Sequence, residues 1–506
     1  MADFFDSSSW LFDFFAGAAF LFIFVIGLVF LALVMVFISD VTQRKDAIRR
    51  NFPVIGRLRH FFSELGKFFR QYFFAMDREE MPFNRELRNW VYRAAAGADN
   101  TVPFGSTRSL QPQGTILFAN AAYPDPDLYG ADAAPMVIGA GCRRPFAALS
   151  FFNISGMSYG AISRPAVSAL SRGAALAGCW LNTGEGGLSP WHVDGDCDIV
   201  FQIGTAKYGC RTEDGNLNPA RLTELAAHDQ VRMFEIKLAQ GAKPGKGGIL
   251  PGAKVTEEIA GIRGIPVGQD SISPNRHLDI ANDNQLIDTI NRVRDLTGKP
   301  VGLKTVIGEP RWLDRFFETI VKRGEGCAPD FITVDSADGG TGAAPLPLID
   351  YLGLPIQESL PRVVDKLNEF GLRHRIRVIA SGKLITPGPV AWALAAGADF
   401  VASARGFMFA LGCIQALQCN RNTCPTGITT HQRRLQRGLD PADKAERVWR
   451  YHRGVEKEVG IIAHSCGVHD PRMLGRQHCR IVTENGATMP FEKIYPDVPA
   501  PVRHDL

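Results

Sequence analysis

The stretch FFNISGMSYGAIS (residues 151–163) contains a short apolar strand that runs into a polar, glycine-containing cluster. Seven more short apolar strands follow, each ending in a polar or glycine-rich cluster, with helical segments between them. The later clusters occupy residues 182–185, 202–204, 236–237, 303–304, 335–336, 381–382 and 403–406. Eight alternating βα units predict an α/β protein with a (β/α)8 TIM barrel, whose chemistry lies at the carboxyl ends of the strands.

A doubly wound open sheet is the alternative for alternating strands and helices. The first strand lacks the G-x-G-x-x-G turn that nucleotide-binding sheets of that kind usually carry, so the pattern favours the barrel. Glycine-containing turns follow the seventh and eighth strands, at Gly382 and at Arg405 and Gly406. Backbone N–H groups at these turns predict a phosphate site, although glycine after a strand is more often only a turn.

Composition limits the kinds of protein that this chain can be. The chain has 506 residues, of which 45% are apolar and 21% are charged, so it can bury a large core. Its 56 basic and 52 acidic residues give a formal net charge of +4, which is too balanced for a general nucleic-acid binder. We therefore expect one large α/β domain with attachments and no nucleic-acid partner.

Residues 16–38 carry no charge, and a helix of this length can span the hydrocarbon layer of a membrane. A signal peptide is the competing interpretation, but no Lys or Arg occurs before Arg44. A core helix is less favoured because no polar stripe interrupts the run. Acidic residues precede the span, and Arg44, Lys45, Arg49, Arg50, Arg57, Arg59, Lys67 and Arg70 follow it. The positive-inside rule then predicts a single-pass protein of the inner (cytoplasmic) membrane with its catalytic domain in the cytoplasm.

The segment RLRHFFSELGKFFRQYFF (57–74) mixes bases with paired aromatic residues. This composition suits a helix lying among anionic lipid headgroups, and equally a helix docked on the catalytic body or on another subunit. We divide the chain into an N-terminal segment with the span (1–40), a basic aromatic arm (41–100), a lead-in segment (101–146), the barrel with a cysteine loop (147–430), and C-terminal helices and tail (431–506).

Three of the ten cysteines are grouped, as Cys413, Cys419 and Cys424, and a proline follows the last. Three thiolates are too few for a closed four-thiolate zinc site unless a histidine joins, and they would suit an iron–sulfur cluster that lacks one iron. Three buried thiols near a helix end are the alternative. The other seven cysteines are scattered singly, as expected for reduced cytoplasmic thiols.

Several motifs together allow a family to be suggested. They are MSYGAIS (157–163), NTGEGG (182–187), QGAKPG (240–245), ISP (272–274), DGGTGA (338–343) and the cysteine run. Their sequence and order closely resemble the FMN-binding domain of glutamate synthases, over roughly residues 147–475. The resemblance implies a barrel that holds FMN beside a [3Fe–4S] cluster and reduces 2-iminoglutarate, formed from 2-oxoglutarate and ammonia, to glutamate.

The resemblance also implies a role for individual residues. Catalytic and substrate-binding positions fall on Glu185, Lys243, Arg263 and Lys304. Cofactor-binding positions fall on Met157, Ser158, Tyr159, Asn182, Lys237, Lys304, Gly339, Gly340, Gly382, Arg405 and Gly406, and cluster ligands on Cys413, Cys419 and Cys424. A strand-end lysine such as Lys304 would stabilise the reduced flavin, and Lys243 and Arg263 would bind a dicarboxylate.

The sequence departs from the family in three places. It has no N-terminal cysteine nucleophile of a glutaminase domain and no room for the β-helical domain that follows the barrel, and Ile249 stands where the family tends to have a substrate-binding glutamine. Two functions therefore remain open. The chain is either a membrane-anchored reductase of a 2-imino acid, made from a 2-oxoacid and ammonia or an amine, or a non-catalytic or electron-transfer subunit of a membrane complex. No nicotinamide motif is visible, so we expect electrons from a partner protein such as ferredoxin.

Overall fold

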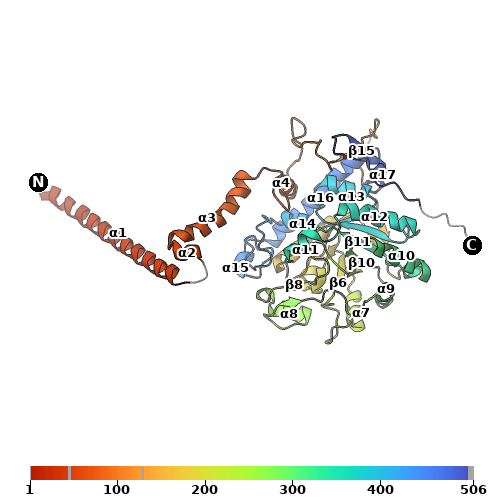
Figure 1. Cartoon of the computed structure of the whole chain (residues 1–506), viewed down its shortest axis with the longest axis horizontal. Helices are drawn as coiled ribbons and strands as arrows, with labels where there is room; N and C mark the ends of the chain where they lie inside the picture. Colours follow the sequence, from red (N-terminus) through yellow and green to blue (C-terminus); the bar gives the residue numbers. More distant parts are fainter. Residues whose placement is uncertain (1, 44–46, 127–129, 500–506) are drawn as a thin grey trace, which may run out of the picture. The chain divides into compact units, whose positions relative to one another are not determined.

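The computed structural model describes residues 2–43, 47–126 and 130–499. The chain divides into two compact units, Met1–Glu86 and Leu87–Leu506, each with its own internal packing (Figure 1). Of the bases expected after the membrane span, Arg44 and Lys45 lie outside the described residues, and the side chains of Arg59 and Lys67 are likewise outside the description.

The first unit is helical. It contains α1 (Ala2–Thr42), α2 (Ala47–Asn51), α3 (Ile55–Phe69) and a π-helical turn (Arg70–Phe74). Within α1, the segment Phe12–Thr42 is long and apolar enough to cross a membrane, and none of its most apolar window is buried. A signal sequence near the N-terminus can have the same length and composition, so the helix is consistent with the predicted anchor without identifying it.

A carboxylate joins the three helices of this unit. Asp40, near the end of α1, is fully covered and accepts hydrogen bonds from Arg49 Nη2 at 2.7 Å and Arg57 Nη2 at 2.8 Å. Its second oxygen accepts the backbone N–H of Val54 at 3.1 Å. This carboxylate therefore ties the start of α3 to the end of α1. Phe61 and Phe62 on α3 expose 58% and 60% of their surface.

The second unit is built on a closed barrel of eight parallel strands, as the sequence predicts. The strands follow one another around the barrel in chain order, and β13 closes it by pairing with β4. They are β4 (Phe152–Ile154), β5 (Leu181–Asn182), β6 (Ile199–Ile203), β7 (Val231–Lys237), β10 (Val301–Val306), β11 (Phe331–Asp335), β12 (Arg377–Ser381) and β13 (Phe400–Ser403). Because these strands are covered by helices, nearly all their residues are buried.

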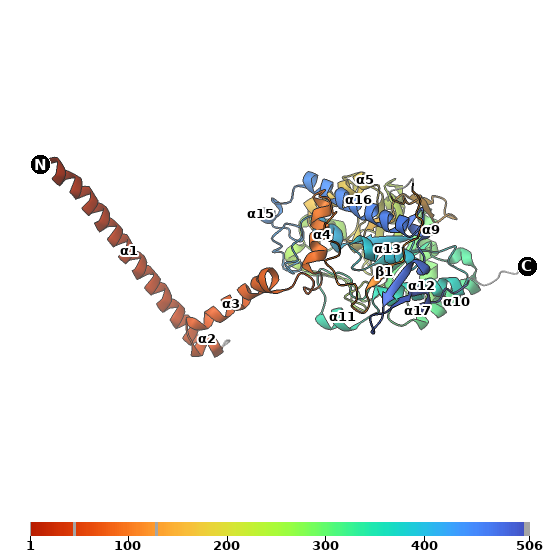
Figure 2. The same cartoon turned by 90° about the horizontal axis from the view of Figure 1, so that it is seen from above.

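Helices connect successive strands and surround the barrel (Figures 1 and 2). They are α5 (Arg164–Ala177), α6 (Pro190–Val193), α7 (Pro219–Ala227), α9 (Asp283–Thr297), α10 (Arg311–Arg323), α12 (Ile356–Glu369), α13 (Pro387–Ala395) and α14 (Arg405–Ala410). Local signals set several of their ends: Asn282 caps α9 by accepting Gln285 N–H, and the left-handed Gly298 ends it. The long α16 (Pro441–Ser465) packs along α5 and α13.

Excursions from the barrel carry the remaining elements. The connection from β7 to β10 contains β8 (Ile249–Leu250), α8 (Glu257–Arg263) and β9 (Ser271–Ile272), and α11 (Leu346–Tyr351) follows β11. Outside the barrel, β2 (Met136–Ile138) pairs with β3 (Phe146–Ala148), and β1 (Ile116–Phe118), β14 (Cys479–Val482) and β15 (Thr488–Pro490) form a small antiparallel sheet. The short helices α4 (Arg85–Ala95), α15 (Arg433–Gln436) and α17 (Phe491–Ile494) complete the chain.

Candidate active site

The carboxyl ends of two neighbouring strands place two lysines side by side. Lys237 at the end of β7 is in register with Lys304 of β10, and both side chains are buried. Lys237 Nζ lies 3.3 Å from Glu185 Oε2, and Lys304 Nζ lies 3.5 Å from Asp335 Oδ2. Each buried ammonium thus has a carboxylate counter-charge, as burial of a charge requires.

Glu185 and Lys243 extend this charged group. Burial disfavours the carboxylate of Glu185, but the neighbouring cations of Lys237, Lys243 and Arg263 outweigh burial and lower its pKa. Burial, assisted by Lys237, lowers the pKa of Lys243 to about 8, while Glu185 opposes that shift. Within the described part of the chain, no carboxylate lies within 4 Å of the Lys243 ammonium. A cation with this environment, still protonated at neutral pH, is suited to bind an anion.

Arg263 closes the group from the excursion between β7 and β10. Its side chain is 4% exposed and donates to Ser271 Oγ at 3.2 Å and to the carbonyl of Tyr159 at 3.1 Å. The guanidinium also lies over the Tyr208 ring, 5.1 Å from its centre, and its Nε has no hydrogen-bond partner among the residues that the structure describes. Burial lowers the pKa of Arg263, and the interactions with Tyr208 and Glu185 oppose that shift. The structure therefore brings the predicted residues Glu185, Lys243 and Arg263 together.

The predicted cofactor residues of the first two strand ends have different settings. Met157 is buried, whereas Ser158 is partly exposed. Tyr159 directs its hydroxyl away to Glu258 Oε2, at 2.5 Å, and burial together with that carboxylate raises the pKa of the tyrosine. Asn182 donates through Nδ2 into the barrel interior and accepts the backbone N–H of Gly184 through Oδ1, at 3.0 Å.

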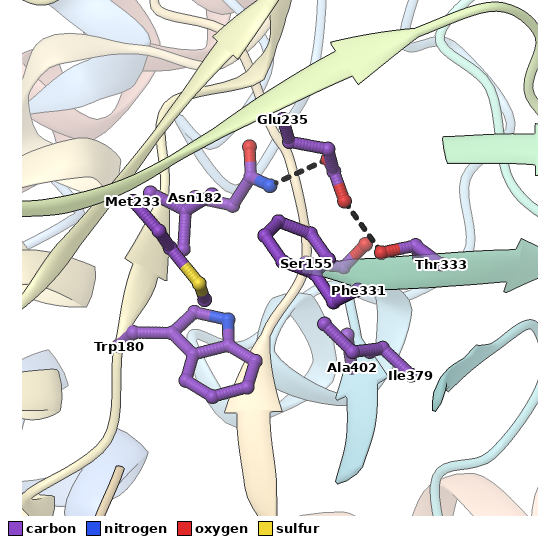
Figure 3. A pocket seen from close by; sticks show the side chains of 10 residues that line it. Ser155, Trp180, Asn182, Met233, Glu235, Phe331, Thr333, Ile379 and Ala402 are labelled. Atoms are coloured by element: carbon purple, nitrogen blue, oxygen red, sulfur yellow. Dashed lines mark hydrogen bonds between the residues drawn. The ribbon is translucent and has the colours of Figure 1, made fainter. Parts of the chain in front are cut away.

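A carboxylate inside the barrel was not among the predicted site residues. Glu235 of β7 is 2% exposed and accepts hydrogen bonds from Asn182 Nδ2 at 2.8 Å and Thr333 Oγ1 at 2.6 Å (Figure 3). Gln202 Nε2 donates to the same carboxylate at 2.6 Å. One signal in the sequence could have found it: Glu235 stands two positions before Lys237 in the same strand, and therefore on the same face.

The turns after β11, β12 and β13 meet around Asp338. Arg405 Nη2 donates to the Asp338 carbonyl at 3.0 Å, and Lys383 Nζ lies 2.9 Å from the Asp338 carboxylate. Gly340 lets the Arg405 side chain pass, because a Cβ there would lie 3.0 Å from Arg405 Nε. Lys383 is a cation that we did not predict, although it directly follows Gly382. The predicted phosphate turns are therefore neighbours in the structure.

Three of the predicted glycines allow close backbone packing in this region. Gly382 has φ +125°, and a Cβ there would lie 2.2 Å from Ser336 Cβ. A Cβ on Gly406 would lie 2.1 Å from the Tyr451 hydroxyl. Gly339 donates its backbone N–H to the Ser336 carbonyl at 2.9 Å. Larger residues at Gly382 and Gly406 would displace the turns after the seventh and eighth strands.

The cysteine loop brings its three thiols close enough to interact electrostatically. Besides burial, Cys419 and Cys424 raise the pKa of Cys413, and Cys424 raises the pKa of Cys419. Burial raises the pKa of Cys413 to about 12 and also raises that of Cys419. Burial disfavours the thiolate of Cys424 as well, but hydrogen bonds from Thr426 and Thr429 outweigh it and lower its pKa. All ten cysteines are free.

Further groups around the loop suit bound anionic sulfur. Gln415 N–H donates to Cys413 Sγ at 3.4 Å, and the buried Lys254 donates to the carbonyls of Cys419 and Ala161. Across residues 2–43, 47–126 and 130–499, no three His, Cys, Asp or Glu side chains are arranged closely enough to hold a metal ion. The donor set of three thiols with N–H, O–H and ammonium neighbours fits an iron–sulfur cluster chemically, and the cluster stays a prediction.

Comparison with known proteins agrees with this geometry. The family model "Conserved region in glutamate synthase" matches residues 129–469. A "Glutamate synthase large subunit-like protein YerD" of Bacillus subtilis is 37% identical over 498 residues, covering 91% of this chain and 94% of that protein. An "Archaeal-type glutamate synthase [NADPH]" of Thermotoga neapolitana is 35% identical and covers 62% of this chain and 58% of its own length. A glutamate synthase large subunit-like protein of Rhizobium meliloti is 28% identical over 78% of this chain and 90% of its own.

The closed parallel barrel and the family match together place the protein in the class of (β/α)8-barrel oxidoreductases. Within that class, the chain belongs to the glutamate synthase family. The predicted family and the predicted barrel are both confirmed.

Proposed function

We propose that this protein is a membrane-anchored FMN and iron–sulfur oxidoreductase that reduces a 2-imino acid, formed from a 2-oxoacid and ammonia or an amine, to an amino acid. The observation that carries the proposal is the charged group at the strand ends, where Lys237, Lys304, Lys243 and Arg263 surround Glu185 and Asp335. Family membership adds the class of chemistry.

The residues at the strand ends fit a flavin mononucleotide. The cavity inside the barrel has a volume of about 10 Å³, enough for roughly one water molecule, so it is too small for a flavin, and we place the flavin above it at the strand ends. Lys304 would stabilise negative charge on the ring, and the turns that contain Gly382, Arg405 and Gly406 would hold the phosphate. When bound, FMN supplies hydride for reduction of the C=N bond.

The substrate's carboxylates would bind the cations that face Glu185. Arg263 can hold a carboxylate with two parallel N–H groups, and Lys243 supplies a second positive charge from the loop after β7. Glu185 Oε1 lies against the backbone of Gly248, where a Cβ would approach it to 2.1 Å. The next residue, Ile249, offers no polar group, so we infer that the substrate's second polar end is held less tightly than its 2-oxoacid end.

Electrons would enter through the cysteine loop. Cys413, Cys419 and Cys424 would hold a [3Fe–4S] cluster, and Lys254 bridges their loop to the carbonyl of Ala161, next to the predicted flavin residues 157–159. We propose an electron-donor protein such as ferredoxin as the partner that reduces the cluster. The absence of a nicotinamide motif in the sequence supports a protein donor.

We propose that α1 anchors the protein in the inner (cytoplasmic) membrane and that the catalytic unit is cytoplasmic. The ion pairs of Asp40 with Arg49 and Arg57 hold the beginning of α3 beside the end of the span. If α1 crosses the bilayer, α3 therefore begins at the level of the lipid headgroups. The exposed phenylalanines of α3 would then insert among anionic lipids. Extraction of washed membranes with alkaline carbonate tests the anchor. If the protein is released as readily as a soluble enzyme, the anchor is contradicted.

The decisive experiment is anaerobic reduction of the purified flavoprotein, followed by a screen of oxoacid and amine pairs for reoxidation. We expect at least one 2-oxoacid with ammonia or an amine to reoxidise the flavin and to yield the corresponding amino acid. If no pair reoxidises it while a membrane extract does, the alternative function as an electron-transfer subunit of a membrane complex replaces this one. Direct oxidation of NADPH at ordinary enzymatic rates would contradict the proposed protein donor.

A further inference from the structure

Side chains inside the barrel form layers of different chemistry along its axis. The lower layer is apolar and includes Trp180, Val200, Met233, Phe331 and Ile379. Two residues further along the strands, the same inward face carries Asn182, Glu235 and Thr333 (Figure 3). Gln202, two residues after Val200, donates to Glu235 in the same layer. Two residues further again come Lys237 and Asp335 of the candidate active site. The polar layer therefore separates the apolar core from the strand ends.

Glu235 connects this polar layer. Its Oε1 accepts from Asn182 Nδ2 at 2.8 Å and from Gln202 Nε2 at 2.6 Å, and its Oε2 accepts from Thr333 Oγ1 at 2.6 Å. Gln202 is directly opposite Glu235 in the strand register. On the other side of β7, the residue in register with Glu235 is Gly302 of β10. Because Gly302 has no side chain, nothing from β10 at this position separates Glu235 from Thr333. One carboxylate thus joins side chains from β5, β6, β7 and β11.

A carboxylate in this position decides which way two carboxamides face. An ionised carboxylate can only accept hydrogen bonds, so the NH2 groups of Asn182 and Gln202 must point toward it. The Asn182 oxygen is then directed to Gly184 N–H. For Gln202, the oxygen is the amide atom left to accept a hydrogen bond from a ligand. A flavin carries a donor of this kind, the imide N–H of its pyrimidine ring.

We propose that Glu235 is a positioning residue of the flavin site, an inference that rests on the proposed function. It holds the carboxamides of Asn182 and Gln202 in one orientation, so that the floor of the site presents a fixed acceptor. It does so from inside the barrel and without touching the flavin. Within the described part of the chain, the hydrogen-bond donors of Glu235 are all neutral, so this role can be tested separately from the ion pairs at the strand ends.

Four variants of the full-length protein test the proposal, with FMN affinity of the flavin-free protein measured by fluorescence quenching. Glu235→Leu removes the acceptor, and we expect FMN to bind at least about tenfold more weakly because two buried amides lose their partner. Glu235→Gln keeps an acceptor for both amides and turns its NH2 to the Thr333 hydroxyl, which can accept. We expect its affinity to stay within about threefold of the wild type. Thr333→Val alone should behave like Glu235→Gln.

The double variant Glu235→Gln with Thr333→Val covers the case in which Glu235→Leu does not fold. With valine at 333, nothing specifies which way the introduced carboxamide faces, so we expect a loss of affinity larger than the product of the two single effects. Glu224→Gln on the exposed surface of α7 is the matched control. Thermal unfolding of each variant separates loss of the barrel from loss of the site.

The results distinguish this inference from the proposed function. If the wild type itself binds no FMN, the proposed function fails and this inference fails with it. If the wild type binds FMN, and folded Glu235→Leu or the folded double variant binds it equally well, only the positioning role is overturned. A loss in Glu235→Gln as large as in Glu235→Leu would also overturn it, because charge rather than orientation would then be the cause.

Discussion

The strand ends of the barrel and the cysteine loop solve the problem of buried charge differently. At the strand ends, each strand-end lysine faces a carboxylate of the same chain, as in Lys237 with Glu185 and Lys304 with Asp335. In the loop, the thiols are instead approached by neutral donors, the Gln415 N–H at Cys413 and the Thr426 and Thr429 hydroxyls at Cys424. Gln415, Leu417 and Asn422 adopt left-handed backbone conformations that non-glycine residues rarely take. We therefore expect the strand-end site to hold its shape without a ligand, and we propose that a bound cluster would stabilise the loop.

Removing one thiol tests most directly whether the cysteine loop differs from the strand ends in holding a metal cluster. We expect Cys419→Ser to lose essentially all cluster iron and the brown component of the visible spectrum, because two thiolates cannot hold the cluster. Flavin content should be unchanged, since no thiol of the loop is among the predicted flavin-binding residues. Cys327→Ser is the control, because Cys327 lies in the turn before β11, at the amino-terminal end of that strand. Unaltered iron in Cys419→Ser would mean that the loop is only a set of buried thiols.

Changing single glycines compares the rigidity of the strand ends with that of an open turn. Gly382→Ala should lower the free energy of unfolding by more than about 2 kcal/mol, because φ is +125° and the new Cβ meets Ser336. Gly342→Ala is the matched control in a neighbouring turn, where a Cβ meets nothing within 4 Å. Chemical denaturation measures both. Equal stability of the two variants would contradict the packing described here.

Loss of Lys243, whose ammonium has no carboxylate within 4 Å among the described residues, tests whether this cation binds the substrate. We expect Lys243→Ala to weaken binding of dicarboxylate oxoacids by about 1.5–3 kcal/mol, the usual contribution of a charge-assisted hydrogen bond. Lys243→Arg should recover part of the loss. Calorimetric titration of the oxidised protein gives the affinities, and identical affinities for the wild type and Lys243→Ala would remove Lys243 from the binding site.

The pH dependence of binding sharpens the same comparison. Because the pKa of Lys243 is lowered to about 8, its ammonium is present below that pH and is lost as pH rises through it. Affinity for an anionic oxoacid should therefore be constant near pH 7 and fall, by up to about tenfold per pH unit, above pH 8. In Lys243→Ala this decline should disappear. A wild-type affinity that is flat to pH 10 would contradict the assignment.

Removal of iron by a chelator should change the thermal stability of the barrel least of all these changes, and should alter the cysteine loop only locally. We expect the iron-free protein to be cleaved faster by trypsin after the exposed Arg421, while the thermal midpoint of the barrel changes little. Mass spectrometry of the fragments locates the cut. Cleavage of Arg421 at the same rate with and without iron would show that the loop holds its shape by itself.

The family motifs and the alternating strands were sufficient to predict the barrel, its eight strand ends and the grouping of Glu185, Lys243 and Arg263. The barrel and its strand ends follow from local pattern, that is, from apolar runs of strand length and the turns after them, whereas the grouping of the three charged residues followed from the family resemblance. The sequence did not predict Glu235 or Lys383 as parts of the site, because their partners lie on strands and turns far away in the chain. It also did not predict that the Tyr159 hydroxyl faces Glu258 instead of the strand ends.

The sequence by itself determined which elements form and in what order, since the strand pattern, the uncharged helix of residues 16–38 and the spacing of three cysteines are local properties. Only the tertiary structure decided which charges meet. Closure of the barrel places β7 beside β10, so that Lys237 and Lys304 become neighbours although 67 positions separate them, and it brings Asn182, Gln202 and Thr333 to one carboxylate. The physical reason is that register between parallel strands, and not distance along the chain, sets which side chains share the interior.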